Sequence, residues 1–172
     1  MALSIRPLTL DELDFLWDMC AIAAHVSDAA AARGNAGLAR YVAGWGRPHD
    51  VALVAVDDDT RQRAGAIWMR RFSASDPGYG YFDEHTPELG LGVGAAFRGA
   101  GVGRLLLAGL IEIAETRYPG LTLSVFDWNH AAVRLYRSAG FVTFAEYPNS
   151  GGTSSLKMRL GFAGAPPRDS AP

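Results

Sequence analysis

The sequence contains little cysteine, no long apolar run and no excess of basic charge. Cys20 is the single cysteine among 172 residues, so an internal disulfide cannot form and nothing indicates an oxidising compartment. Sixteen basic and 18 acidic residues give a net charge of -2 without a basic run, which argues against nucleic-acid and anionic-membrane partners. No stretch reaches the roughly 18 consecutive apolar residues of a membrane span. We therefore expect a cytoplasmic protein with neither a membrane nor a nucleic-acid partner.

Patterns for metal ligands, hydrolases and common nucleotide sites are also missing. The four histidines are scattered, and neither His-x-x-x-His nor Cys-x-x-Cys spacing occurs, so we predict no metal. There is no Gly-x-Ser-x-Gly elbow to supply a hydrolase nucleophile. The P-loop motif Gly-Lys-Ser/Thr is absent, and Leu106 stands where a dinucleotide fingerprint needs its third glycine.

Apolar residues are abundant enough for one globular core. They make up 49% of the chain, against 20% charged residues, and this predicts a single domain over residues 1–160. Residues 161–172 are small, polar and proline-containing, so we expect a disordered C-terminal tail there.

Helical patterns dominate the first 50 residues. Thr9 and Glu12 have capping-box spacing, and apolar residues then recur with helical period up to Ala24, which places Cys20 in the core. After an alanine-rich stretch and two glycines, the apolar spacing over residues 38–45 predicts a second amphipathic helix.

Strand patterns dominate the rest of the chain. Residues 51–56 and 64–72 predict a hairpin, and residues 73–87 predict an irregular segment. Further strands are predicted at 89–93, 121–126, 141–147 and 154–160, and further helices at 102–117 and 131–139. This order indicates a mixed α/β sheet with helices on both faces.

A glycine-rich segment, Arg98-Gly-Ala-Gly-Val-Gly-Arg104, joins a predicted strand to an apolar helix. Glycines let backbone N–H groups approach an anion closely, and the helix that follows directs its free N–H groups and positive dipole end the same way. Such a site suits a pyrophosphate. The structural alternative is that these glycines only form a tight turn.

Two motifs carry a resemblance to a known family. The run Arg98-x-x-Gly101-x-Gly103 resembles the pyrophosphate-binding signature of the GNAT-type N-acetyltransferases. A second run, Asn129-x-x-Ala132-x-x-Leu135-Tyr136-x-x-x-Gly140-Phe141, is similar to another signature of that superfamily in order and distance. The detailed resemblance covers Glu88 to Phe141, while the first half agrees only in its element order.

The resemblance implies a GNAT-type α/β (α+β) fold: a single domain with a mixed, mostly antiparallel sheet of six to seven strands and about four helices. It also implies that two central strands splay apart and that the pantetheine arm of acetyl-CoA lies between them. The implied cofactor-binding residues are Leu91, Gly92, Val93, Arg98, Gly99, Ala100, Gly101, Val102, Gly103, Arg104, Asn129 and Tyr136.

Amide formation needs a group that takes a proton from the amine and one that gives a proton to the leaving thiol. The resemblance points to Tyr136 as the acid; the alternative is that Tyr136 only packs against the sheet. Glu88, at the start of a strand, is our first candidate for the base, acting directly or through water, although a lone glutamate there can equally be a solvated surface group. Three neighbours could replace or assist it: Asp83, Glu84 and His85.

Asn129, Gly90 and Gly92 each have more than one interpretation. Asn129 can cap the following helix, which we favour, or contact the cofactor. Gly90 and Gly92 can mark a bulge, a close approach of pantetheine to the backbone, or simply a weakened strand. A backbone N–H near Leu91 or Gly92 is the predicted stabiliser of the oxyanion.

The functional hypothesis is an N-acetyltransferase that moves an acetyl group from acetyl-CoA directly to a primary amine. The acceptor, a small molecule or a peptide, is left unidentified, and a homodimer is left open. Two alternatives are a catalytically silent acyl-CoA-binding module and a nucleotide-binding domain without acyl chemistry.

Overall fold

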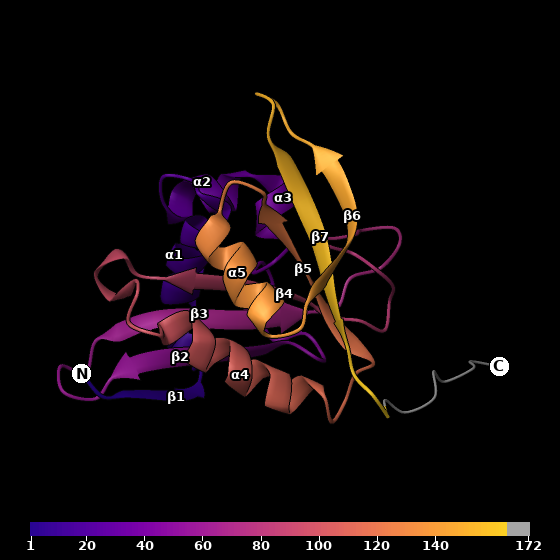
Figure 1. The fold of residues 1–172 in the computed structure, drawn as a ribbon. Helices are drawn as coiled ribbons and strands as arrows, with labels where there is room; N and C mark the ends of the chain where they lie inside the picture. Colours follow the sequence, from indigo (N-terminus) through magenta and orange to yellow (C-terminus); the bar gives the residue numbers. More distant parts are fainter. Residues whose placement is uncertain (165–172) are drawn as a thin grey trace. The chain divides into compact units, whose positions relative to one another are not determined.

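The computed structural model describes residues 1–164, whose fold is drawn as a ribbon in Figure 1. The chain divides into two compact units. The first unit comprises Met1–Arg70 and Gly90–Leu110, and the second comprises Arg71–Leu89 and the residues from Ile111 onward. Residues 165–172 of the predicted tail lie outside the described residues. Strand pairing extends into the start of that predicted tail, since Gly161 pairs with Gly120.

The described residues form seven strands and five α-helices, which confirms the predicted mixed α/β class. In chain order they are β1 (Leu3–Pro7), α1 (Leu13–Ala24), α2 (Ala29–Gly34), α3 (Ala36–Ala39), β2 (Val51–Asp57), β3 (Arg63–Arg70), β4 (Glu88–Val93), α4 (Val102–Ala114), β5 (Gly120–Phe126), α5 (His130–Ser138), β6 (Val142–Pro148) and β7 (Ser154–Gly161). Short 3-10 helices occupy Leu10–Glu12 and Ala95–Phe97. The strand order is β1-β2-β3-β4-β5-β7-β6, with the pairs β1–β2, β2–β3, β5–β7 and β6–β7 antiparallel and β4–β5 parallel.

In the first unit, β2 lies between β1 and β3 (Figure 1). Its antiparallel pairing with β3 confirms the predicted hairpin. Its residues from Ala52 to Asp57 are all buried, which explains why apolar residues occupy both faces of this strand. Helix α4 approaches the sheet closely at Gly109, where a Cβ atom would collide with the side chain of Ile5 and come within 3.3 Å of Leu53. Glycine at this position lets α4 lie against the ends of the Ile5 and Leu53 side chains.

The helix predicted over residues 38–45 is wrong. The alanine-rich stretch before it is the helical part instead: the Asp28 carboxylate accepts a hydrogen bond from the Ala31 N–H at 2.8 Å and starts α2. The next helix ends at Ala39 and is followed by turns. The Arg70 guanidinium donates to the carbonyl oxygens of Arg40 and Ala43, each at 2.8 Å, and so binds the backbone where a longer helix would have continued.

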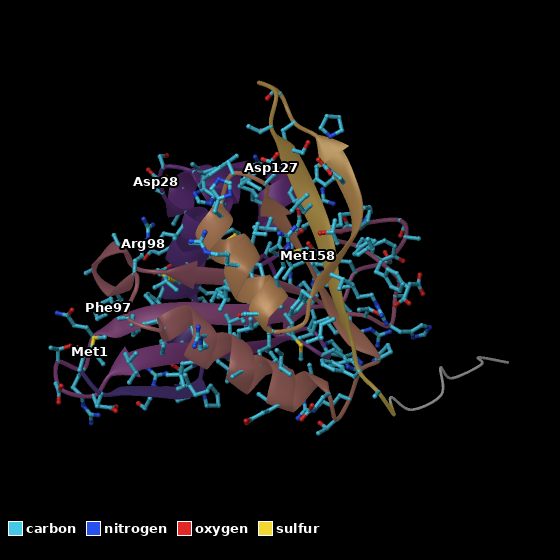
Figure 2. The ribbon with its side chains drawn as sticks, viewed as in Figure 1. Met1, Asp28, Phe97, Arg98, Asp127 and Met158 are labelled. Atoms are coloured by element: carbon cyan, nitrogen blue, oxygen red, sulfur yellow. The ribbon has the colours of Figure 1, made fainter. Side chains whose placement is uncertain are left out.

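The second unit is built on the antiparallel strands β5, β7 and β6. Leu156 and Met158 of β7 are buried, as their alternation with polar residues predicts, and Met158 is labelled in Figure 2. Helix α5 begins where expected, because the Asn129 side-chain oxygen accepts from the Ala132 N–H at 3.3 Å. This confirms the capping role of Asn129. At the first residue of β4, Glu88 pairs in parallel with Thr122 of β5.

Candidate functional site

The glycine-rich segment lies in the first unit, between β4 and α4. Phe97 and Arg98 precede the glycines (Figure 2). Gly99 and Gly101 have φ angles of +76° and +84°, a conformation that residues with a Cβ atom rarely adopt. Both positions therefore need glycine for the path of the backbone, as the tight-turn interpretation requires.

The surroundings of these glycines also suit an anion. No heavy atom lies within 4 Å of the place where a Cβ atom of Gly99 or Gly101 would stand, so both positions face open space. Helix α4 begins at Val102, and its first backbone bond at this end runs from the Leu105 N–H to the Gly101 carbonyl at 3.0 Å. The N–H groups at the start of the helix have no acceptor within the helix, and they carry its positive dipole end. The residues present therefore fit the diphosphate of a nucleotide cofactor.

The other two glycines of interest, Gly90 and Gly92 in β4, have a packing explanation that the sequence did not suggest. A Cβ atom on Gly90 would collide with the Trp68 ring, lying 2.5 Å from its Cε2 atom and 3.0 Å from its Nε1 atom. A Cβ atom on Gly92 would lie 2.9 Å from the Met19 Cα atom of α1. These glycines admit the Trp68 ring and the α1 backbone, so their side of the strand is filled by the protein's own core.

Glu88 lies in the second unit and is only 2% exposed, which rules out the solvated-surface interpretation. Its Oε1 atom accepts a hydrogen bond from the Gly80 N–H at 2.8 Å. A buried carboxylate requires such partners because its desolvation is costly. The structure therefore ties the candidate base to the irregular segment before β4.

The other candidate groups near Glu88 also belong to this irregular segment. Asp83 accepts hydrogen bonds from the backbone N–H groups of His85 and Thr86, at 2.9 and 2.8 Å, and so shapes the turn into β4. The backbone carbonyl of Glu84 accepts a hydrogen bond from the Arg71 side chain at 2.7 Å, and Glu84 itself is exposed. Asp83 thus has a local structural role, which leaves Glu88 as the buried carboxylate of this group.

Tyr136 lies on α5 in the second unit and is 6% exposed. Its ring meets that of Phe141 edge to face, with centroids 5.8 Å apart. Burial raises the pKa of Tyr136 well above its usual value near 10. The packing role is therefore present, and the phenol holds its proton firmly at neutral pH, as a hydrogen-bond donor must.

Sequence reasoning missed two polar arrangements. Gly80, the donor to Glu88, lies in a segment whose composition predicts only a loop, and no sequence pattern distinguishes it from its neighbours. The second is a buried ion pair in which Arg70 donates to both carboxylate oxygens of Asp50, at 3.0 and 2.8 Å. An arginine at the end of an apolar strand was the only signal for this pair.

Residues 1–164 contain neither a membrane-spanning helix nor a metal-binding cluster. No helix among them is long and apolar enough to cross a membrane. Within the same range, no three His, Cys, Asp or Glu side chains are grouped so that they could hold a metal ion.

Comparison with known proteins gives a family match over most of the chain. The model of the acetyltransferase (GNAT) family matches residues 15–141. The match contains the glycine-rich segment, Glu88 and Tyr136.

Individual relatives and solved structures agree with this match. Mycothiol acetyltransferase from Gordonia bronchialis is 36% identical over a segment that covers 49% of this chain and 32% of that protein. The protein of the same name from Thermobifida fusca is 38% identical, with 52% and 28% covered. The chain thus spans about a third of the length of the curated relatives it matches.

The structure of yncA from Salmonella typhimurium, which holds its cofactor acetyl-CoA, has a TM-score of 0.73 at 19% identity and covers 99% of this chain and 100% of that one. At that identity the likeness is one of fold.

Proposed function

Since the chain belongs to the acetyltransferase (GNAT) family, we propose that it transfers an acetyl group from acetyl-CoA to a primary amine of a small-molecule or peptide acceptor. The observation that carries the proposal is the open glycine segment at the start of α4. Its positive-φ glycines face empty space and its helical N–H groups lack acceptors within the helix. The relatives named as acetyltransferases support the same activity.

In this proposal the residues around the glycine-rich segment bind the cosubstrate. Backbone N–H groups from Gly99 to Arg104 hold the diphosphate, and the charges of Arg98 and Arg104 add to the attraction. The backbone of Leu91, Gly92 and Val93 in β4 pairs with the pantetheine arm, and one of its N–H groups polarises the thioester carbonyl. Acetyl-CoA supplies an activated acyl group and a thiolate as the leaving group.

Glu88 and Tyr136 supply the proton transfers. A C–N bond forms between the amine nitrogen and the acetyl carbon, and the C–S bond breaks. The amine proton passes to the Glu88 carboxylate through a water molecule, because the carboxylate is buried. Tyr136 donates its phenolic hydrogen to the departing sulfur. Since burial raises the pKa of Tyr136, full transfer of its proton to sulfur is less favourable than from a solvated tyrosine, and the phenol acts first as a hydrogen-bond donor to the departing sulfur.

The experiment is an acetyl-transfer assay that follows CoA thiol release with spermidine, phenethylamine and an alanine-initiated hexapeptide as probes. The wild-type protein should acetylate at least one probe. Tyr136→Phe should lower kcat by about 10²-fold or more and leave acetyl-CoA affinity nearly unchanged, because general acid–base catalysis typically contributes 10²–10⁴-fold. Glu88→Gln should lower kcat similarly.

Each alternative function has its own result. A silent acyl-CoA-binding module would bind acetyl-CoA without acetylating any probe. A nucleotide-binding domain would be stabilised by ATP or NAD in a thermal-shift assay and not by acetyl-CoA. At about a hundred times its Kd, acetyl-CoA should add roughly 2.7 kcal/mol to the free energy of unfolding. Full turnover by Tyr136→Phe would reject the assigned acid.

A further inference from the structure

The irregular segment between β3 and β4 is fixed at one point by a buried contact. The N–H of Gly80 donates to the Oε1 atom of Glu88 at 2.8 Å, and both residues are buried. On its other side Gly80 lies directly against the backbone of β5. A Cβ atom at this position would stand 2.5 Å from the Leu123 carbonyl carbon and 2.7 Å from the carbonyl oxygen. We call these three residues, Gly80, Glu88 and Leu123, the Gly80 clamp.

The residues around the clamp, 78–82, form an ordered segment. The Tyr81 N–H donates to the Gly78 carbonyl at 3.2 Å and closes a turn around Gly80. Phe82 meets the Phe144 ring of β6 edge to face at 5.3 Å, and the Arg159 guanidinium lies 4.6 Å from the centre of the Phe82 ring. The segment is thus held at both Gly80 and Phe82, while its aromatic side chains still reach solvent.

The clamp has a consequence for the proposed reaction. A general base must come within hydrogen-bond reach of the proton that it accepts, directly or through one water molecule. The Glu88 carboxylate is already in contact with Gly80, so an amine that delivers its proton to Glu88 has residues 78–82 as neighbours. Tyr79, which is 43% exposed, offers an aromatic face there, and such a face attracts a protonated amine.

We propose that the Gly80 clamp positions the acceptor: residues 78–82 form a wall of the acceptor-binding site, and Gly80 sets where the amine lies relative to Glu88. Gly80 is thus a positioning residue, whose glycine is required by the contact with β5. This inference rests on the proposed function, since it assigns the acceptor side of the same reaction.

The first test measures hydrogen–deuterium exchange of residues 78–82 by mass spectrometry. Glu88→Gln keeps an oxygen acceptor for the Gly80 N–H, so exchange should stay as slow as in the wild-type protein. Glu88→Ala removes the acceptor and should speed exchange in this segment by about tenfold, the effect of losing one hydrogen bond. Equal exchange in Glu88→Ala and the wild-type protein would overturn the clamp.

The second test uses Gly80→Ala and the probe amine with the highest wild-type kcat/KM. The added methyl group meets rigid backbone, so the segment must move; a displacement of about 1 Å can cost up to 10²-fold in a positioned reaction. We expect the KM for the amine to rise by about tenfold or more, with the KM for acetyl-CoA unchanged. The matched control is Gly34→Ala, where no heavy atom lies within 4 Å of the new methyl group and no change is expected.

The two proposals fail in different ways. An unchanged amine KM in Gly80→Ala, with faster exchange in residues 78–82, would overturn the positioning role and leave the acetyltransferase assignment intact. If Glu88→Gln retains full kcat, Glu88 is not the base, and the link from the clamp to the amine is overturned with it. If the wild-type protein acetylates none of the probes, the proposed function fails, while the exchange experiment still decides whether the clamp exists.

Discussion

Replacing Glu12 by glutamine should destabilise the first unit in a pH-dependent way. Glu12 is 7% exposed, and its two carboxylate oxygens accept hydrogen bonds from Arg6, each at 2.7 Å. The Thr9 N–H donates to the same carboxylate at 3.1 Å, which completes the predicted capping-box contact. The Arg63 guanidinium lies 3.5 Å from the Glu12 carboxylate. Glutamine keeps the shape and one acceptor but loses the charge.

The size of the effect follows from the pKa. The hydrogen bonds from Arg6, which outweigh the opposing effect of burial, and those from Thr9 lower the pKa of Glu12 from 4.5 to about 2. This lowering of the pKa corresponds to about 3 kcal/mol at most. Since the Arg6 side chain is 44% exposed, solvent screens part of this interaction, and we expect about 2 kcal/mol.

The sign of the pH dependence is fixed by the direction of the pKa change. The folded-state pKa lies below that of the unfolded chain, so the ionised carboxylate stabilises the fold fully above about pH 4.5. This contribution is lost as the pH falls toward 2. Urea unfolding should therefore show Glu12→Gln to be less stable by about 2 kcal/mol at pH 7 and by less than half of that at pH 3. Glu115→Gln, at an exposed position after α4, is the control and should change little. A difference for Glu12→Gln that is the same at pH 7 and pH 3 would refute the reasoning.

Three other predictions follow from buried groups and from the cap of α5. Burial raises the pKa of Cys20 to about 11, so its thiol should not react with a disulfide reagent at pH 8 until the protein is unfolded; rapid labelling of the folded protein would contradict this. Arg70→Met leaves the Asp50 carboxylate buried without its cation and should lower the free energy of unfolding by about 3–5 kcal/mol, and a loss below about 1 kcal/mol would be inconsistent with a buried pair. Asn129→Ala should cost about 1 kcal/mol and Asn129→Asp much less, whereas equal losses would reject the cap.

The sequence predicted elements well wherever one local pattern determined them. The strands with alternating or fully apolar residues, the capping-box pair Thr9 and Glu12, and the cap at Asn129 all occur as expected. The end of one predicted helix differs from the end in the structure. Helix α4 ends at Ala114, three residues before the prediction, and the N–H groups of Arg117 and Tyr118 both donate to the Ala114 carbonyl in the turns that follow.

Predictions failed where the deciding contact came from a distant residue. The apolar spacing over residues 38–45 is helical, but Arg70, far along the chain, binds two backbone carbonyls of that stretch. For Gly90 and Gly92, packing against Trp68 and Met19 gives a reason for glycine that no local pattern shows. The burial of Glu88 likewise depends on Gly80 in a segment without periodicity.

The central claim is that the glycine segment before α4 binds the diphosphate of acetyl-CoA, and calorimetric titration tests it most directly. Gly101→Ala places a methyl group in the open space of the segment, at a φ of +84°. Gly151→Ala places one at a φ of +85° with equally open surroundings, in the turn between β6 and β7. Any strain should therefore be matched in the two variants. The account predicts that Gly101→Ala binds acetyl-CoA about tenfold or more weakly, while Gly151→Ala binds it like the wild-type protein. Equal affinity in all three proteins, or no heat of binding in any of them, would contradict it.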